Sequence, residues 1–360
     1  MSKRVLIFLS AILIFFLCAF TAFYVGYFLI SSAGFDKKEE IFMVKKGSSL
    51  TLVATELERR RLIKSKDLFM LWATMKGGAR DIKAGEYSLN QSMPPVRIFN
   101  ILISGAVKTH PLTIPEGLTA EQIADLLAKK DLVNRMEFIP LVRDKTLVAY
   151  YHIDGSSLEG YLYPDTYLIN RDMGARELVD LMLNRFWNVF NPLIRGENSA
   201  TGGLLSPSEI VILASIVEKE TSLAEERPVI ASVFLNRLKK RMRLESDPTV
   251  IYGLKDFDGN LRRKDLRTPN PYNTYTNYGL PPGPIANPGR EALMAVINPA
   301  ETNYLYFVSK NDGSHYFSAT LKEHNRAVAR YQKRRRSMSG KKQDDRTFQK
   351  KEDKNEKKRP

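Results

Sequence analysis

The strongest hydrophobic feature of the chain is an unbroken apolar run near its N-terminus. Residues 5–35 contain no charged side chain and consist mainly of Leu, Ile, Phe, Val and Ala. A helix of about 20 such residues crosses the hydrocarbon core of a bilayer, so the run predicts a transmembrane anchor. Residues 31–33, Ser-Ser-Ala, would suit a signal peptidase, but the apolar region of a signal peptide is normally only about 7–15 residues long. We therefore expect an uncleaved, single-pass anchor over residues 5–35.

The charges beside this run predict its orientation in the membrane. Lys3 and Arg4 precede it, so residues 1–4 are expected to be a cytoplasmic stub under the positive-inside rule. Lys37 and Lys38 follow the run, and because their acidic neighbours count little under this rule, the charge bias across the run is small. The expected arrangement is an anchor in the plasma membrane with the rest of the chain on the extracytoplasmic side.

Two stretches that start 70 residues apart share one pattern of apolar positions. Residues 44–63 and 114–133 carry the same Gly, Ala, Leu and Leu at matching places. Each stretch predicts a short strand, a glycine turn and a helix, the helices being capped by Ser49 and Thr119. Gln122, three residues after Thr119, completes the pattern of a capping box.

The first copy continues into a longer unit. Residues 64–76 predict a second helix, and the alternation over 82–89 predicts a returning strand. This order over 36–110 resembles LysM-like modules, which bind glycans that contain N-acetylglucosamine. A strand–glycine–helix unit also occurs in many other settings, and the turn offers no aromatic platform, so glycan binding stays open. Residues 111–145 are expected to be a second half-module or a connector.

A nearly all-apolar helix is predicted to begin at Ser206-Pro207 and to end in two carboxylates, Glu218 and Glu220. Such a helix should be buried. Desolvation and the negative end of the helix dipole both disfavour a charged carboxylate there, so its pKa should rise, as a general acid near neutral pH requires. The alternative is that these side chains only pair with Lys219 or Arg227.

Three further segments mix aromatic and polar side chains in a way that suits a sugar-binding cleft. Residues 158–167 are dense in Tyr and contain Glu159, and residues 268–285 are long, irregular and rich in Tyr and Asn. Asp247 or Ser246 is expected to cap a short helix that follows Leu244. Near the C-terminal end, residues 311–314 predict the turn of a β-hairpin.

Five motifs then occur in order: Ala214–Thr221, Ser232–Leu238, Asp247–Gly253, Tyr272–Tyr275 and Gly279–Gly283. Together with the anchor they closely resemble the membrane-anchored endolytic murein transglycosylases, the MltG/YceG-like family of bacteria. The resemblance covers nearly the whole chain. It implies an α+β protein with an N-terminal transmembrane helix, LysM-like modules and a catalytic domain over 146–333, located at the bacterial plasma membrane.

The resemblance also implies a reaction. A lytic transglycosylase, which is a carbon–oxygen lyase, cleaves the bond between N-acetylmuramic acid and N-acetylglucosamine inside peptidoglycan strands without water. It leaves 1,6-anhydro ends and so trims or terminates nascent strands. The family's catalytic glutamate corresponds to Glu220, with Glu218 as the second choice. The expected substrate-binding residues are Glu159, Asp247, Asn273 and Tyr275.

Two other interpretations remain beside this one. The same cleft could belong to a glycoside hydrolase that pairs Glu220 with Asp247 or Glu159 and uses water. The chain could also be a non-catalytic peptidoglycan-binding scaffold. The resemblance further suggests contacts with penicillin-binding proteins and with the elongation or division machinery, besides glycan strands and the membrane.

Composition and charge argue against several other classes of protein. The net charge is +15, but residues 331–360 carry 13 basic and 5 acidic side chains, a net of +8, and residues 334–360 are expected to be a disordered basic tail. No basic–aromatic recognition motif occurs outside it, so nucleic-acid binding is not expected. One cysteine excludes a disulfide scaffold, and the four histidines lack metal-ligand spacing. No metal and no cofactor are expected, although His315 could approach the cleft.

Overall fold

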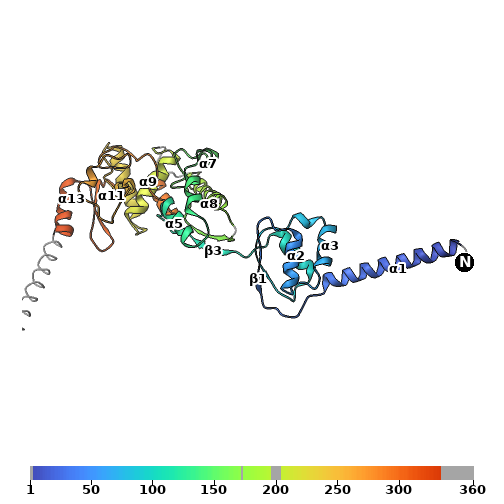
Figure 1. Ribbon diagram of the computed structural model, residues 1–360. Helices are drawn as coiled ribbons and strands as arrows, with labels where there is room; N and C mark the ends of the chain where they lie inside the picture. The colour runs from blue at the N-terminus through green and yellow to red at the C-terminus, as the bar shows by residue number, and fades with distance from the viewer. Residues whose placement is uncertain (1–2, 172, 196–203, 334–360) are drawn as a thin grey trace, which may run out of the picture. The chain divides into compact units, whose positions relative to one another are not determined.

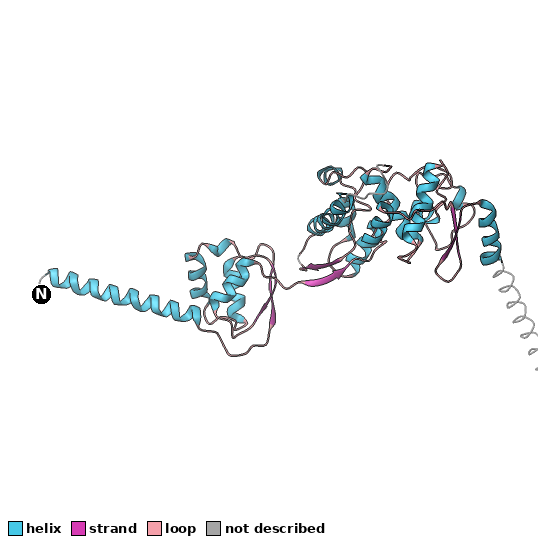
Figure 2. Cartoon of the chain, turned by 180° about the vertical axis from the view of Figure 1, so that it is seen from behind, coloured by secondary structure: helices cyan, strands magenta, loops and turns pink. Residues whose placement is uncertain are grey.

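The computed structural model describes residues 3–171, 173–195 and 204–333, drawn in Figures 1 and 2. Backbone contacts divide the chain into two compact units. Unit 1 comprises residues 1–112 and 166–173, and unit 2 comprises residues 113–165 and 174–360. The basic tail predicted over 334–360 lies outside the described residues. The described residues form both α-helices and β-strands, which confirms the predicted α+β class.

Helix α1 (Lys3–Ile30) forms the apolar run that begins unit 1. Residues 11–30 have a mean hydropathy of 2.3 and are long and apolar enough to cross a membrane. The helix ends at Ile30, so the last residues of the apolar stretch predicted over 5–35 are not helical. Phe28 and Leu29 in its final turn are buried, at 4% and 7% exposed.

A strand–helix–helix–strand module follows in unit 1, in the order predicted for residues 36–110. Strands β1 (Glu40–Val44) and β2 (Gly85–Leu89) pair antiparallel, with Phe42 opposite Tyr87. Helices α2 (Leu50–Arg59) and α3 (Lys66–Met75) lie between them in the chain, followed by a 3-10 turn at Gly78–Arg80. Whether this module binds glycan stays a prediction.

Local sequence explains where these elements begin. Gly47 takes the left-handed conformation in the turn after β1, with φ of 81°. The side chain of Ser49 then accepts a hydrogen bond from the Leu52 backbone and caps α2, as the sequence predicted. Helix α4 (Pro95–Ser104) also packs on this module, because Ile98 and Leu102 belong to the same hydrophobic core as Phe28.

The second copy of the pattern also acquires a returning strand. Strand β3 (His110–Thr113) pairs with β4 (Thr166–Ile169). Between them in the chain come the helices α5 (Ala120–Lys129), α6 (Arg135–Val142) and α7 (Lys145–Tyr150). The sequence predicted only a half-module or connector over 111–145. The returning strand was missed because α7 and a long turn-rich segment delay it.

Unit 2 surrounds helix α9 (Pro207–Glu220), which contacts α10 (Arg227–Lys239), α11 (Asp247–Gly253) and α12 (Arg290–Ile297). The long helix α8 (Ala175–Arg195) packs on α6 and α12. A hairpin of β5 (Tyr306–Ser309) and β6 (His315–Ser318) follows, turning over the predicted residues 311–314. Short elements complete the unit: a 3-10 turn (Asp265–Arg267), α13 (Leu321–Val328) and a π-helical turn (Ala329–Lys333).

Helix α9 is the central element of unit 2. Every residue from Ile210 to Val217 is buried, as the apolar pattern predicted. Its start is a capping box, in which the Ser206 hydroxyl accepts from the Glu209 backbone at 3.3 Å and Glu209 accepts from the Ser206 backbone at 2.8 Å. The helix stops at Glu220 because Thr221 adopts an extended conformation. The buried helix therefore holds its last residue, Glu220, in a fixed place.

Candidate active site

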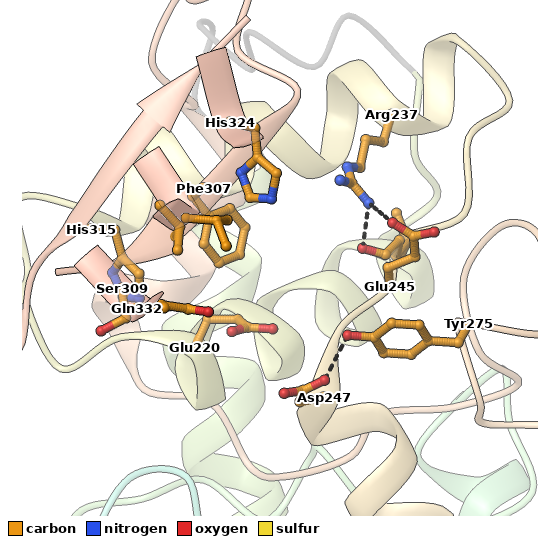
Figure 3. A pocket seen from close by; sticks show the side chains of 13 residues that line it. Glu220, Arg237, Glu245, Asp247, Tyr275, Phe307, Ser309, His315, His324 and Gln332 are labelled. Carbon is orange, nitrogen blue, oxygen red and sulfur yellow. Dashed lines mark hydrogen bonds and ion pairs between the residues drawn. The ribbon is translucent and has the colours of Figure 1, made fainter. Parts of the chain in front are cut away.

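A cavity of about 370 Å³ lies at the C-terminal end of α9 (Figure 3). Helices α9, α10, α11 and α13, the β5–β6 hairpin and the loop after Asn273 contribute its walls. Its polar lining comprises Glu220, Arg237, Glu245, Asp247, Tyr275, Ser309, His315, His324 and Gln332. Three of the residues predicted from the sequence, Glu220, Asp247 and Tyr275, therefore meet at one cavity.

Glu220 has a single side-chain partner among the described residues. The Ser246 hydroxyl donates a hydrogen bond to Glu220 Oε1 at 2.5 Å. The pKa of Glu220 is raised to about 7, mainly by burial; the bond from Ser246 lowers it, and the nearby Asp247 charge raises it. At neutral pH this carboxyl group is therefore divided between its acid and its carboxylate forms, so it can both donate and accept a proton.

Asp247 and Tyr275 form a hydrogen-bonded pair beside Glu220 in Figure 3. The Tyr275 hydroxyl donates to Asp247 Oδ1 at 2.6 Å. Burial, followed by the bond to Asp247, raises the pKa of Tyr275, so its hydroxyl keeps its proton throughout the neutral range. The pair thus places a fixed negative charge and a fixed dipole at the edge of the cavity.

Ser246 is positioned by two buried threonines. The Ser246 backbone donates to the Thr274 hydroxyl at 3.0 Å, and that hydroxyl lies 2.8 Å from the hydroxyl of Thr249. Thr249 in turn donates to the Ser246 carbonyl at 2.7 Å. The sequence predicted that Ser246 or Asp247 would cap α11, but the Ser246 side chain is used on Glu220 instead of on the helix.

Arg237 lines the cavity, and its Nε and Nη1 donors are occupied by the protein. Its guanidinium bonds the carbonyls of Arg243 and Leu244 at 3.0 Å, the carbonyl of Leu305 at 2.7 Å and the carboxylate of Glu245 at 3.0 Å. These bonds connect α10 to the loop before Ser246 and to the segment before β5. Arg237 therefore holds the walls of the cavity in place.

Glu218 lies on the opposite face of α9, as a separation of two helical residues dictates. Its Oε1 is 3.2 Å from Arg227, and its Oε2 accepts from the Gly289 backbone at 3.0 Å. Burial also raises its pKa. Glu218 does not line the cavity, so the ion pair with Arg227 that the sequence offered as an alternative applies to this carboxylate.

Glu159 is buried in a different part of unit 2 and does not line the cavity. It accepts from the Ala120 backbone at 3.0 Å, from Asn287 at 3.1 Å and from the Tyr252 hydroxyl at 3.2 Å. Burial raises its pKa to about 7. These bonds join the first turn of α5 to two distant segments, and its predicted contact with sugar stays a prediction.

Asn273 is also buried, at 1% exposed, and does not line the cavity. Its amide donates to the carbonyls of Thr268 at 2.8 Å and Leu266 at 3.2 Å, and its oxygen accepts from the Tyr275 backbone at 2.9 Å. It therefore orders the irregular loop and positions Tyr275 from behind. Contact with sugar stays a prediction for Asn273 as well.

Several residues of the site were not found from the sequence as site residues. Arg237 and His324 line the cavity, and Ser246 bonds Glu220. No spacing marks them, because each reaches the site through contacts between distant segments. Within residues 3–171, 173–195 and 204–333, no group of three or more His, Cys, Asp or Glu side chains is arranged to hold a metal ion.

Comparisons with known proteins identify one family. The profile of the YceG-like family matches residues 42–330. A Bacillus subtilis protein named endolytic murein transglycosylase is 34% identical over 327 residues, which are 86% of this chain and 90% of that protein. A longer Streptococcus pneumoniae protein of the same name is 31% identical over 331 residues, 82% of this chain and 59% of that protein.

A solved structure gives the same result. The crystal structure of a yceG-like protein from Listeria monocytogenes is 33% identical in sequence and superposes with a TM-score of 0.55. The match covers 81% of this chain and all of that one. The family profile covers well over half of the chain, and the relatives exceed 30% identity over most of its length. This chain belongs to the YceG-like family.

Proposed function

We propose that this chain is an endolytic peptidoglycan transglycosylase that cuts glycan strands between N-acetylmuramic acid and N-acetylglucosamine without water. The observation that carries the proposal is Glu220, which lies at the wall of a cavity with a pKa of about 7 and with Ser246 as its partner. The relatives named endolytic murein transglycosylase supply the substrate class. Trimming or termination of nascent strands is the expected consequence.

The first chemical step is protonation of the leaving group. Protonated Glu220 donates its proton to the glycosidic oxygen while the bond between that oxygen and C1 of the muramoyl sugar breaks. The electron pair of the bond goes to the oxygen, which leaves as the free hydroxyl of N-acetylglucosamine. Positive charge develops at C1, and the Asp247 carboxylate at the same cavity is the charged group suited to stabilise it.

The second step closes a ring. Glu220, now a carboxylate, takes the proton from the 6-hydroxyl of the muramoyl sugar, and O6 bonds to C1. The product is a 1,6-anhydro end, and Glu220 is again protonated. Because the substrate supplies the nucleophile, one carboxyl group of balanced pKa is sufficient. The bond from Ser246 keeps that carboxyl in one orientation for both steps.

A hydrolase is the second candidate, because Asp247 lines the same cavity as Glu220. A carboxylate pair of this kind can activate water and leave a reducing end. Glu159, the other partner considered for such a pair, does not line the cavity. A non-catalytic scaffold is the third candidate, and it would bind strands without cutting them.

One experiment separates these candidates. Purified glycan strands are incubated with the full chain and with its Glu220→Gln variant, and the ends are analysed by mass spectrometry. The proposal expects 1,6-anhydro ends from the wild type and very few from the variant. Reducing ends would replace it with the hydrolase, and strands of unchanged length would replace it with the scaffold.

We also propose that α1 is retained as a membrane anchor and places the rest of the chain on the extracytoplasmic side. The support is its final turn, because Phe28 and Leu29 belong to the core of unit 1. Cleavage after residue 33 would remove these core residues. The expected result is an N-terminal peptide of the intact chain in the membrane fraction by mass spectrometry. A mature protein that begins after residue 33 would contradict it.

A further inference from the structure

His315 lies at the wall of the cavity, at the first position of β6. In the view of Figure 3, Glu220 lies between His315 on one side and Asp247 with Tyr275 on the other. The His315 side chain is 12% exposed, so the imidazole is largely enclosed by protein. The reaction described above assigns it no role.

Glu226, the residue before α10, holds His315 at two points. Its Oε1 accepts from the His315 backbone at 2.7 Å, and its Oε2 lies 2.6 Å from His315 Nδ1. The ring also packs edge-on against Phe307, with centroids 5.4 Å apart. Two bonds from one carboxylate, together with this aromatic contact, leave the imidazole with one orientation.

The contact with Glu226 also determines which nitrogen is available. A carboxylate can only accept hydrogen bonds, so Nδ1 carries the proton in the bond to Glu226. In the neutral ring the lone pair is then on Nε2. No described residue bonds Nε2, which leaves this nitrogen for a ligand in the cavity. A sugar hydroxyl is the complementary donor.

The same carboxylate reaches the end of the helix that carries Glu220. Glu226 Oε2 accepts from the Thr221 hydroxyl at 3.3 Å, and Thr221 directly follows Glu220. The Thr221 hydroxyl in turn accepts from the Leu223 backbone at 3.1 Å. Glu226 thereby joins the hairpin that holds His315 to the end of α9, so the two cavity groups keep a fixed separation.

We propose that His315 is a substrate-binding residue whose Nε2 accepts a hydrogen bond from a hydroxyl of the glycan, and that Glu226 is the residue that positions it. The proposal rests on the proposed function for the identity of the ligand as a glycan. His324 also lines the cavity, but it is held differently from His315. Its ring stacks on Tyr306 with centroids 5.2 Å apart, burial lowers its pKa, and no carboxylate among the described residues bonds it.

Two substitutions of His315 test the contact, measured as kcat and KM of the full chain on peptide-free glycan strands. In His315→Asn the side-chain amide can replace Nδ1 and keep the bond to Glu226, but nothing replaces Nε2. We expect KM to rise about tenfold, the effect of one hydrogen bond, with a smaller change in kcat. His315→Gln reaches the place of Nε2, and its KM should stay closer to that of the wild type.

The matched control is His152→Asn. His152 is exposed, lies away from the cavity and has a φ of 53°, a conformation that Asn tolerates well. Its kinetics should equal those of the wild type. If His315→Asn and His315→Gln were equally impaired, or if both matched the control, the contact through Nε2 would be rejected.

Glu226→Gln tests the positioning role through a double-mutant cycle. The single variant should raise KM in the same direction as His315→Asn. Because Glu226 acts through His315, the double variant should be no worse than His315→Asn alone. Additive effects on KM would mean that Glu226 acts independently of the imidazole, and this part of the proposal would fail.

A binding measurement keeps this test separate from that of the proposed function. Glycan affinity is compared in the Glu220→Gln background with and without His315→Asn, where no cleavage is needed. Weaker binding on loss of His315 supports the contact even if the wild type leaves the wrong ends or none. Equal affinity rejects it even if 1,6-anhydro ends are formed. Thermal unfolding of each variant identifies any loss of fold.

Discussion

Glu159 and Glu220 have the same pKa, about 7, for the same main reason, which is burial. Their surroundings differ. Glu159 accepts hydrogen bonds from a backbone amide, a side-chain amide and a tyrosine hydroxyl, and it has no contact with the cavity. Glu220 accepts one bond from Ser246 and borders the cavity. One carboxylate is occupied by the protein, and the other is free for a ligand.

The comparison teaches that a raised pKa reports desolvation and does not by itself identify a catalytic acid. Glu218 supports this point, because burial raises its pKa too, although it pairs with Arg227 on the other face of α9. The number of protein donors around each carboxylate, and its access to a cavity, distinguish the three.

Glu220→Gln should abolish most of the activity. The amide cannot deliver a proton, and general acid–base catalysis contributes about a hundredfold to ten-thousandfold, so kcat should fall by about a thousandfold. The substitution keeps the shape of the side chain, and the midpoint of thermal unfolding should change little. The measurement is kcat on glycan strands. Activity within about tenfold of the wild type would contradict the assignment of Glu220, and not Glu159, as the catalytic acid.

Glu218→Gln should lower the stability of the fold and leave kcat unchanged. It breaks a buried ion pair and leaves the Arg227 charge without its main partner, at a cost of about 3 kcal/mol in the free energy of unfolding. Denaturant unfolding measures this loss. The folded fraction should retain its kcat, and a variant of normal stability but without activity would exchange the roles of Glu218 and Glu220.

Glu159→Gln is the matched partner of the first substitution. The amide must place its donor against at least one group that now donates to Glu159, so about 2 kcal/mol of unfolding free energy should be lost. Its kcat per folded molecule should stay close to that of the wild type. A selective loss of kcat with unchanged stability would give Glu159 the role in sugar contact that the sequence suggested.

The pH dependence of kcat/KM should shift in opposite directions when two neighbours of Glu220, Asp247 and Ser246, are substituted. The acid form of Glu220 is lost above its pKa of about 7, so kcat/KM should decline as pH rises through that value. Asp247→Asn removes a charge that raises this pKa and should move the decline to lower pH. Ser246→Ala removes a bond that lowers it and should move the decline to higher pH. Shifts in one common direction would contradict this account.

Much of the fold was accessible from the sequence because it depends on local pattern. The capping box at Ser206 and the buried stripe after it predicted α9 correctly, and Thr119 with Gln122 predicted the start of α5. The turn over residues 311–314 was also correct. These features use contacts within a few residues of one another, which single-sequence reasoning can read.

The site was only partly accessible because its contacts are long-range. Ser246 and Glu220 are 26 residues apart, and His315 and Glu226 are 89 residues apart. No periodicity connects such pairs. The sequence also could not separate Asn273, whose amide orders a loop, from a residue that contacts sugar, since both are polar residues in an aromatic segment. The structure shows the role of Asn273 in ordering the loop, and its contact with sugar stays a prediction.

The end of α1 has a consequence for the order in which the protein is made. Phe28 and Leu29 share one core with Leu102, which the ribosome adds more than 70 residues later. The last turn of the first helix therefore lacks its final neighbours until α4 has been synthesised. Unit 1 therefore cannot close from its N-terminal half alone, because the core around Phe28 and Leu29 is complete only with α4.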